Sequence, residues 1–326
     1  MKATLSMITQ ATKGCARVTE SADGIHFYRF TEAQEEFYRT YNSDFYKKTF
    51  STAGVRLEFV TDSRSMSFET SCTLGSSRKN AYFDVFCNGK ALGHVGGDMN
   101  DGGSFCFGGS FDLGDGLKTV QIYFPWTSAA VLRCLELDDG ASFSPVDRPN
   151  KMLIFGDSIT HGYDGYFPSQ TYASILTDKL NANAINKGIG GEIFKPELAT
   201  LEEEYDPDWI TVAYGTNDWS HRSAEDFENA IRGFYSNLSQ KYPNAKIFGI
   251  SPIWRSNEFE NKAAGKFSDI LGKMERLTAD LPNITIIDGY NLIPHDKSLF
   301  TDGLHPNAIG NVHYALNLTN QILKLI

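Results

Sequence analysis

The spacing of hydrophobic residues changes near residue 145, and this change constrains the fold more than any other feature of the sequence. Before it, apolar and polar residues alternate: Val55, Leu57 and Phe59 are separated by charged residues, and the same alternation recurs in 81–92 and 118–124. A period of two is typical of strands with one buried face. Short strands separated by glycine-rich turns predict a β-sandwich or jelly roll in this half.

Two local signals refine the first half. Asn88-Gly89, between alternating runs, is the strongest short signal for a β-hairpin, because both turn positions need positive φ. Residues 130–137 are a further strand candidate. Residues 31–48 do not alternate in this way, and they are a candidate helix rich in aromatic residues.

The second half has a different pattern, in which apolar runs of strand length alternate with helical periods. The clearest helix begins near Ser223, and the last one follows Pro306. Strand–helix alternation predicts a parallel sheet with helices on both faces. The join lies in the proline-containing stretch 140–151, so we expect a sandwich domain over 1–145 and an α/β domain over 146–326. The expected strands of the sheet cover residues 152–155, 184–189, 209–214, 246–251 and 284–288.

Gly156-Asp157-Ser158 follows the first of these strands, at the edge where such a sheet binds ligands. Ser158 would lie where the strand turns into a helix, close to backbone N–H groups that favour negative charge. Ser158 is therefore a candidate nucleophile. A tight turn with a helix cap is the other interpretation, because turns prefer these three residue types.

Later loops carry the other groups that acyl transfer needs. Gly191 and the glycine before it allow backbone N–H groups to approach a ligand, and Asn217 offers an amide to a developing oxyanion. Asp302 can fix the tautomer of His305 and leave its other ring nitrogen facing a nucleophile. Alone, each has a plainer interpretation as a flexible loop, an Asx-turn or a helix cap. Together with Ser158 they predict a nucleophile, a base, an orienting carboxylate and oxyanion donors.

The stretches GDSIT, NKGIGGE, GTND and DGLH, in this order, resemble the four motifs of the SGNH (GDSL-type) hydrolase superfamily. The resemblance covers the chain from about residue 150 onward. It implies a flavodoxin-like three-layer α/β/α domain with a parallel sheet. It also implies a Ser158, Asp302 and His305 triad and an oxyanion hole formed by Ser158, Gly191 and Asn217. The departure is an isoleucine after the serine, where the motif's name has leucine.

A β-sandwich ahead of such a domain is similar to carbohydrate esterases of the acetyl-xylan and acetyl-mannan esterase type, which carry a jelly roll before the hydrolase. This likeness is architectural, with only loose cues such as YFDVF and IYFPW. It implies a carbohydrate acetylesterase that removes O-acetyl groups from oligosaccharides. A lipase, thioesterase or arylesterase of the same superfamily is one alternative. A glycan-binding protein with an inert hydrolase domain is another. The sandwich itself is left as a lid, a wall of the cleft or a dimer surface.

Tyr163, Trp219 and Trp254 follow the first, third and fourth expected strands, and each could stack on a sugar ring. Hydrophobic packing is an equally good interpretation for all three. The sequence has no HExxH, CxxC, phosphate-loop or dinucleotide motif, so we expect no metal and no cofactor.

The charge of the chain bears on its partners. Lys and Arg number 30 against 40 Asp and Glu, a net charge of −10, which argues against nucleic acid and anionic membranes. An oligosaccharide or small-molecule ester is the expected partner. The sequence has no apolar run of membrane-spanning length and no signal-like N-terminus, and its five cysteines include no CxxC pair. We therefore expect reduced thiols and a cytoplasmic protein, with a trimmed secretory signal left open.

Overall fold

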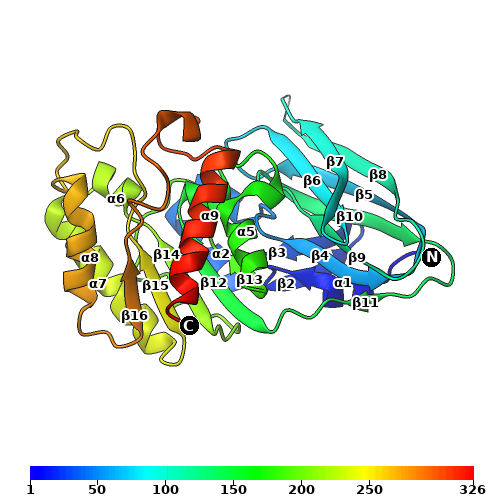
Figure 1. Ribbon diagram of the computed structural model, residues 1–326, viewed down its shortest axis with the longest axis horizontal. Coiled ribbons are helices and arrows are strands. Elements are labelled where there is room, and N and C mark those ends of the chain that lie inside the picture. The colour runs from blue at the N-terminus through cyan, green and yellow to red at the C-terminus, as the bar shows by residue number, and fades with distance from the viewer. Residues whose placement is uncertain (101) are drawn as a thin grey trace.

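The computed structural model describes residues 1–100 and 102–326. Figure 1 shows two parts side by side, a β-sandwich from the N-terminal half and an α/β part from the C-terminal half. The predicted fold class is thereby confirmed. The five cysteines, all among the described residues, form no disulfide.

The sandwich consists of two antiparallel sheets, whose inward side chains, Phe59, Phe68 and Phe83 among them, form one core. The first sheet has the order β1-β4-β9-β6-β7, with β11 paired to β4. Its strands are β1 (Thr12–Lys13), β4 (Arg56–Thr61), β6 (Asn80–Cys87), β7 (Lys90–Asp98), β9 (Lys118–Tyr123) and β11 (Ser144–Pro145). The second sheet, in the order β2-β3-β10-β5-β8, consists of β2 (Arg17–Ser21), β3 (Gly24–Tyr28), β5 (Ser65–Leu74), β8 (Ser104–Asp112) and β10 (Ser128–Leu137).

The hairpin predicted at Asn88-Gly89 joins β6 to β7. Asn88 has φ 50° and Gly89 has φ 74°, and Cys87 pairs with Lys90. Positive φ at both turn residues matches the right-handed twist of the two strands, which is why this dipeptide favours the connection.

Among the described residues of this half, α1 (Leu5–Ala11) precedes the strands, and α2 (Glu32–Tyr41) and α3 (Ser43–Thr49) lie between β3 and β4. The candidate helix over 31–48 is thus two helices. The backbone of Asn42 is extended and ends the first helix, and its side chain caps the second by accepting from the backbone N–H groups of Asp44 and Phe45. Tyr38 of α2 is buried in the core of the α/β part.

The parallel sheet has the order β13-β12-β14-β15-β16, the strand order of a flavodoxin-like fold. Along β12, Leu153 and Phe155 enter one core, whereas Met152 and Ile154 enter the other. Both faces of the sheet are covered, which explains the continuous apolar run. The strands are β12 (Asn150–Gly156), β13 (Ala182–Asn186), β14 (Trp209–Ala213), β15 (Lys246–Ile250) and β16 (Ile284–Ile287).

Helices cover the two faces of this sheet as separate layers. The core on one face includes residues of α7 and α8, and the core on the other includes residues of α5 and α9. The helices of this part are α4 (Ser158–His161), α5 (Tyr172–Lys179), α6 (Thr216–His221), α7 (Ala224–Lys241), α8 (Ile270–Thr278) and α9 (Ala308–Leu323), with 3₁₀ turns η1 (Pro168–Gln170), η2 (Phe267–Asp269) and η3 (Lys297–Leu299).

The predicted strand boundaries differ from those of the structure by up to three residues, most at the second strand. The second strand was expected over 184–189 but ends at Asn186, whose side chain accepts from the N–H of Gly188 and donates to the carbonyl of Thr160. These bonds turn the chain out of the sheet. The last helix follows Pro306 as predicted, with Asn307 as its N-cap and Ala308 as its first residue.

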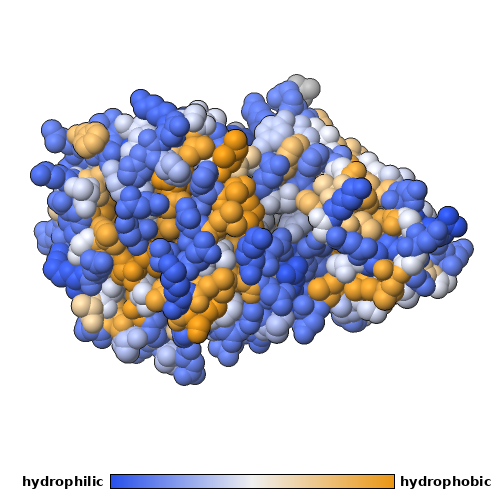
Figure 2. Space-filling model, viewed as in Figure 1, coloured by the Kyte–Doolittle hydropathy of each residue, from blue (hydrophilic) through white to orange (hydrophobic). Residues whose placement is uncertain are grey.

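Figure 2 shows a band of hydrophobic residues over α9. Ile309, Val312, Leu316 and Leu323 are exposed along this helix. Their spacing puts them on one side of it, opposite the residues that face the sheet. Among the described residues, no helix combines the length and the apolar character needed to cross a bilayer.

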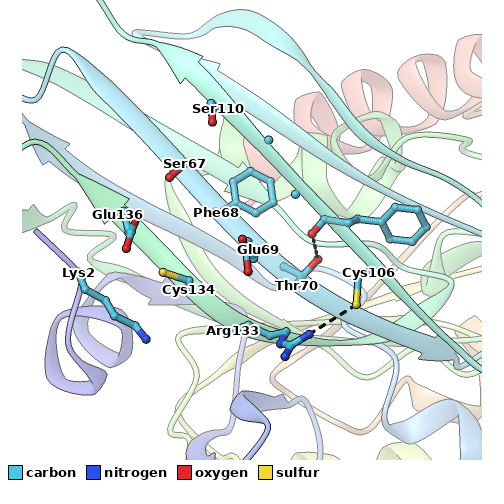
Figure 3. Close-up of a pocket in the computed structure, with 13 residues that line it drawn as sticks. Lys2, Ser67, Phe68, Glu69, Thr70, Cys106, Ser110, Arg133, Cys134 and Glu136 are labelled. Atoms are coloured by element: carbon cyan, nitrogen blue, oxygen red, sulfur yellow. Dashed lines mark hydrogen bonds between the residues drawn. The ribbon is translucent and has the colours of Figure 1, made fainter.

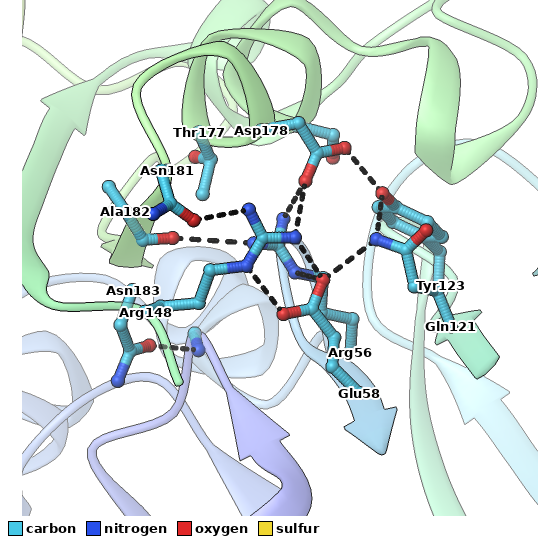
Figure 4. A network of polar contacts seen from close by, with 12 residues as sticks. Arg56, Glu58, Gln121, Tyr123, Arg148, Thr177, Asp178, Asn181, Ala182 and Asn183 are labelled. Carbon is cyan, nitrogen blue, oxygen red and sulfur yellow. Dashed lines mark hydrogen bonds and ion pairs between the residues drawn. The ribbon is translucent and has the colours of Figure 1, made fainter. Parts of the chain in front are cut away.

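A buried polar network joins the sandwich to the α/β part (Figure 4). Glu58 of β4 is completely buried, and it contacts the guanidinium groups of Arg56 at 3.0 Å and Arg148 at 2.7 Å. Both arginines also contact Asp178 of α5, which accepts a hydrogen bond from Tyr123 of β9. Alternating charges therefore satisfy one another across the join.

We expect Glu58→Gln to lower the free energy of unfolding by about 3–5 kcal/mol, because it removes the completely buried carboxylate and leaves the partly exposed Asp178 as the shared counter-charge of Arg56 and Arg148. Burial alone would raise the pKa of Glu58, but Arg56 and Arg148 hold it below its usual value. The stabilisation is therefore present at neutral pH and is lost as the pH falls through this lowered pKa.

Urea denaturation at pH 7 measures this effect. Glu36→Gln is the matched control, because it removes the partner of Arg39 from an ion pair in which both side chains are 57% exposed. That change should cost less than about 1 kcal/mol. Equal losses in the two variants would contradict the role given to the network.

Candidate active site

The turn after β12 presents the hydroxyl of Ser158. Ser158 is the first residue of α4, and the side chain of Asp157, not that of Ser158, caps this helix by accepting from the N–H of Ile159 at 3.0 Å. A Cβ on residue 156 would lie 1.9 Å from Oγ1 of Thr160, so only glycine fits before Asp157. The cap expected as an alternative thus exists, but Asp157 provides it and the serine hydroxyl stays available.

His305 connects Ser158 to Asp302. Its Nε2 lies 2.8 Å from Oγ of Ser158, and its Nδ1 lies 2.8 Å from Oδ2 of Asp302. The other oxygen of Asp302 accepts from the backbone N–H groups of Leu304 and His305. Partial burial would raise the pKa of Asp302, but these hydrogen bonds hold it below its usual value, so the carboxylate is ionised at neutral pH. With Nδ1–H donated to Asp302, Nε2 is free to accept from the serine hydroxyl.

The predicted oxyanion groups come from three neighbouring loops. Gly191 follows β13 with φ 91°, a conformation that favours glycine, and Asn217 lies in the first turn of α6, after β14. One amide N–H of Asn217 donates to the carbonyl of Glu192 at 2.9 Å, which ties these two loops together and leaves the second N–H free. The backbone N–H groups of Ser158 and Gly191 donate to none of the described residues.

A buried arginine of the N-terminal half holds the loop after β13. Arg29 is completely buried, and its guanidinium donates to the carbonyl oxygens of Asn186 and Gly188 on this loop. It also donates to the carbonyl oxygens of Lys48 and Ser51. The guanidinium therefore joins the sandwich side of the molecule to the loop that carries Gly191.

His161 of α4 supports the same loop from the other side. Its Nδ1 accepts from the N–H of Gly190 at 3.2 Å, and its Nε2 lies 2.9 Å from the carbonyl oxygen of Trp126 and 2.8 Å from Oγ of Ser51. Burial, reinforced by the positive charge of Arg29, lowers the pKa of His161 well below its usual value. A neutral imidazole with Nδ1 as acceptor is the form that fits these partners.

Three buried carboxyl groups lie in the loops of the site. Burial raises the pKa of Asp157 and Glu192 to about 7 and that of Asp218 to about 6. Each accepts a backbone N–H, and Asp218 takes its hydrogen bond from Phe194 of the neighbouring loop. These carboxyl groups hold the loops rather than face solvent.

The three aromatic residues named as sugar contacts have different surroundings. Tyr163 is the one beside the site, because its ring stacks on His305 with centroids 5.7 Å apart. Trp254 is largely buried and donates to Glu258. Trp219 is completely buried and donates to the carbonyl of Gly265, so it offers no face to a ligand, and the expectation of a substrate contact was wrong for it.

Sequence reasoning missed two charged residues beside His305. Asp164 lies directly after Tyr163, and Arg78 comes from the loop between β5 and β6 of the sandwich. The stretch GDSITHGYDG contains His161 and Asp164, but nothing in its pattern separates them from ordinary turn residues. Arg78 carries no motif at all.

One group of three side chains among the described residues has ligand atoms within 4.8 Å of one another: Asp164, Asp302 and His305. Each of these atoms already faces a partner, since Asp164 pairs with Arg78, and Asp302 pairs with Nδ1 of His305. A metal ion would have to displace these contacts. The absence of a metal or cofactor stays a prediction.

A separate groove of about 890 Å³ lies on the outer face of the second sandwich sheet (Figure 3). Its exposed residues include Glu69, Cys106, Arg133 and Glu136, and Phe68 in its lining is buried in the sandwich core. None of the predicted catalytic residues lines it.

Comparison with known proteins gives a family and a set of related folds. Residues 154–312 match the model of the GDSL-like Lipase/Acylhydrolase family, and no curated protein matches the sequence. Salicylyl-acyltransferase SsfX3 from a tetracycline biosynthetic pathway has 18% identity, a TM-score of 0.82 and coverage of 96% of this chain and 94% of that chain.

Two esterase structures are also similar. A family two carbohydrate esterase from Clostridium thermocellum, in complex with cellohexaose, has 16% identity, a TM-score of 0.67 and coverage of 84% of this chain and 93% of that chain. The acetyl xylan esterase Est2A from the rumen bacterium Butyrivibrio proteoclasticus has 17% identity, a TM-score of 0.66 and coverage of 100% and 99%. Because these matches cover most or all of the chain, the fold is shared across both of its halves.

The buried, neutral imidazole of His161 should make the stability of the protein depend on pH. Its pKa in the unfolded chain is about 6.5. Below that pH the unfolded chain takes up a proton that the folded protein refuses, so stability falls as the pH drops from 7 to 5, by up to about 1.4 kcal/mol per unit. The slope of the unfolding free energy against pH measures the protons taken up on unfolding. We expect His161→Gln to reduce this number by nearly one.

Urea denaturation at several pH values in this range measures the slope. His221→Gln, at an exposed histidine, is the control and should leave the slope unchanged. A His161→Gln slope equal to that of the wild type would show that the imidazole is not held neutral by the fold.

Proposed function

Residues 154–312 form a domain of the GDSL-like lipase/acylhydrolase family, and on that premise we propose that the protein is a serine carboxylic-ester hydrolase that removes O-acetyl groups from oligosaccharides through an acyl-enzyme. The observation that carries this proposal is the continuous chain of hydrogen bonds from Ser158 through His305 to Asp302. Such a chain activates a hydroxyl that is unreactive at neutral pH.

In the first half of the reaction, Oγ of Ser158 attacks the ester carbonyl while Nε2 of His305 takes its proton. The new imidazolium is stabilised by the ionised Asp302, which stays ionised. Negative charge develops on the carbonyl oxygen, where the backbone N–H groups of Ser158 and Gly191 and the free amide N–H of Asn217 receive it. Losing one such donor typically costs about 2.7–4 kcal/mol of barrier.

His305 then gives the proton to the leaving sugar oxygen, which ends the first half and leaves the acetyl group on Ser158. In the second half, water attacks the acyl-enzyme while Nε2 of His305 takes its proton. The second tetrahedral intermediate collapses to acetate as His305 returns this proton to Oγ of Ser158. The same residues thus serve both half-reactions, as microscopic reversibility requires.

The carbohydrate substrate is supported by architecture. Two esterases whose names specify carbohydrate or acetyl xylan share the fold over most of this chain, sandwich included. The site also has an aromatic neighbour, Tyr163, beside His305. Tyr163 is itself buried, with 5% of its surface exposed, so its ring supports His305 and does not bear on the choice of substrate.

A second candidate is acyl transfer to a hydroxyl other than water. It is favoured by the likeness in fold to salicylyl-acyltransferase SsfX3, with a TM-score of 0.82 over 96% of this chain. The acyl-enzyme is common to both activities, and only the second nucleophile differs. Glycan binding by an inert protein is less well supported, because the groove of the sandwich presents small and charged side chains, whereas its two phenylalanines belong to the sandwich core.

We expect Ser158→Ala to reduce acetate release from acetylated xylo- and manno-oligosaccharides by at least about a thousandfold, because it removes the hydroxyl that His305 activates. The melting temperature should be unchanged. Ser110→Ala, at an exposed position of β8, is the control and should keep full activity.

A series of p-nitrophenyl esters with acetyl, butyryl and longer chains tests the acyl group. Preference for acetyl supports the proposal, whereas preference for long chains points to a lipase or arylesterase. If an added alcohol accepts the acyl group faster than water does, the protein is a transferase. Turnover by Ser158→Ala close to that of the wild type would refute the catalytic assignment altogether.

A further inference from the structure

The loop between β5 and β6 carries two residues of the sandwich to the side of His305. The N–H and the hydroxyl of Ser77 lie 3.5 and 3.2 Å from the hydroxyl of Tyr163. The guanidinium of Arg78 donates to both oxygens of Asp164, at 2.8 and 2.9 Å. A two-pronged pair of this kind fixes orientation as well as distance.

Asp164 is held in an unusual conformation. Its φ of 63° lies in the left-handed region, which residues other than glycine rarely adopt. Its carboxylate is only 11% exposed, and Oδ2 lies 3.8 Å from Nδ1 of His305. Asp302, which is hydrogen-bonded to the same nitrogen, is 47% exposed. Nδ1 therefore faces two carboxylates, and Asp164, which makes no hydrogen bond to Nδ1, is less screened by solvent than Asp302.

We propose that Asp164, fixed by Arg78 of the sandwich, is a second acidic partner of His305 and that the pair sets the basicity of the imidazole. This inference rests on the proposed esterase function. Asp164 and Arg78 are positioning residues, since both act through His305. When His305 takes the proton of Ser158, Asp164 stabilises the imidazolium, whereas Arg78 opposes it from a greater distance.

The surroundings of His305 limit what else can act on it. Nε2 faces Ser158, and one side of the ring stacks on Tyr163. The guanidinium of Arg78 also lies over the ring of Tyr163, 5.0 Å from the ring centre. Arg255, from the loop after β15, acts by charge on Asp302. Arg78 is thus the charged group that the sandwich adds, and it acts on His305 together with Asp164 of the α/β part.

The negative charge of Asp164 and the positive charge of Arg78 have opposite effects on the pKa of His305. Removing one or the other should therefore shift that pKa in opposite directions. Removing the negative charge with Asp164→Asn should lower the pKa of His305 by about half a unit or more. Removing the positive charge with Arg78→Gln should raise it. Arg78→Lys, which keeps the charge, should shift it less than Arg78→Gln, and the double variant should return toward the wild type.

The experiment follows kcat/KM for p-nitrophenyl acetate between pH 5 and 9, together with an NMR titration of the His305 ring, assigned by its loss in His305→Gln. Arg64→Gln and Asp115→Asn are the matched controls, because this pair lies at 3.0 Å with side chains 75% and 81% exposed. Both should leave the profile unchanged.

A second arm tests whether Asp164 substitutes for Asp302. Asp164→Asn should reduce kcat a few-fold in the wild type and by about tenfold or more in Asp302→Asn, because there it removes the last carboxylate facing Nδ1. Equal reductions in the two backgrounds would overturn this part.

Absence of a pKa shift in Asp164→Asn, or shifts of the same sign in Asp164→Asn and Arg78→Gln, would overturn the inference. Failure of the proposed function has a different signature, which is undiminished turnover in Ser158→Ala. In that case the NMR titration, which needs no activity, still decides whether the pair acts on His305.

Discussion

The guanidinium of Arg29 is the constraint on which the arrangement of the site depends. A completely buried cation needs acceptors for its N–H groups, and the acceptors here are backbone carbonyl oxygens from two distant segments. One segment is the loop after β13, which carries Gly191, and the other is the chain that follows α3. If either segment moved away, the buried guanidinium of Arg29 would lose hydrogen-bond acceptors. The loop and the sandwich side of the molecule are therefore held as one unit.

This arrangement changes how the sandwich is to be viewed. Of the roles left open for it, a wall of the site agrees best with its contacts. Trp126 and Ser51 hold His161, the loop before β6 reaches Tyr163 and Asp164, and the N–H of Ser169 in η1 donates to Asp84 of β6. The buried cluster around Glu58 adds a second join between the two parts. A catalytic half without the sandwich would lose supports on several sides of its site.

The features that could be predicted from the sequence are those that local residue patterns determine. The motif resemblance and the fold class are confirmed. Strands buried on both faces appear in the sequence as continuous apolar runs. The glycine before Asp157 is required because a Cβ there would clash with Thr160. The roles of Ser158, Asp302 and His305 stay predictions, now with a geometry that suits them. Boundaries such as the end of β13 depended on the side-chain bonds of Asn186, which periodicity does not reveal.

Long-range partners could not be predicted from the sequence. Arg78 and Asp164 are 86 residues apart and Arg29 and Asn186 are 157 apart, so only the tertiary fold pairs them. For the same reason the sequence could not tell that Trp219 faces the core whereas Tyr163 lies beside His305. Aromatic residues after neighbouring strands look alike until packing separates them.

The most direct measurement of the central claim is covalent labelling of the intact protein with a dialkyl p-nitrophenyl phosphate, followed by peptide mass analysis. The account predicts one adduct, on Ser158, which forms much more slowly in His305→Ala because the base is missing. An adduct on another residue, or none while esterase activity persists, would contradict the assignment of Ser158 as the nucleophile.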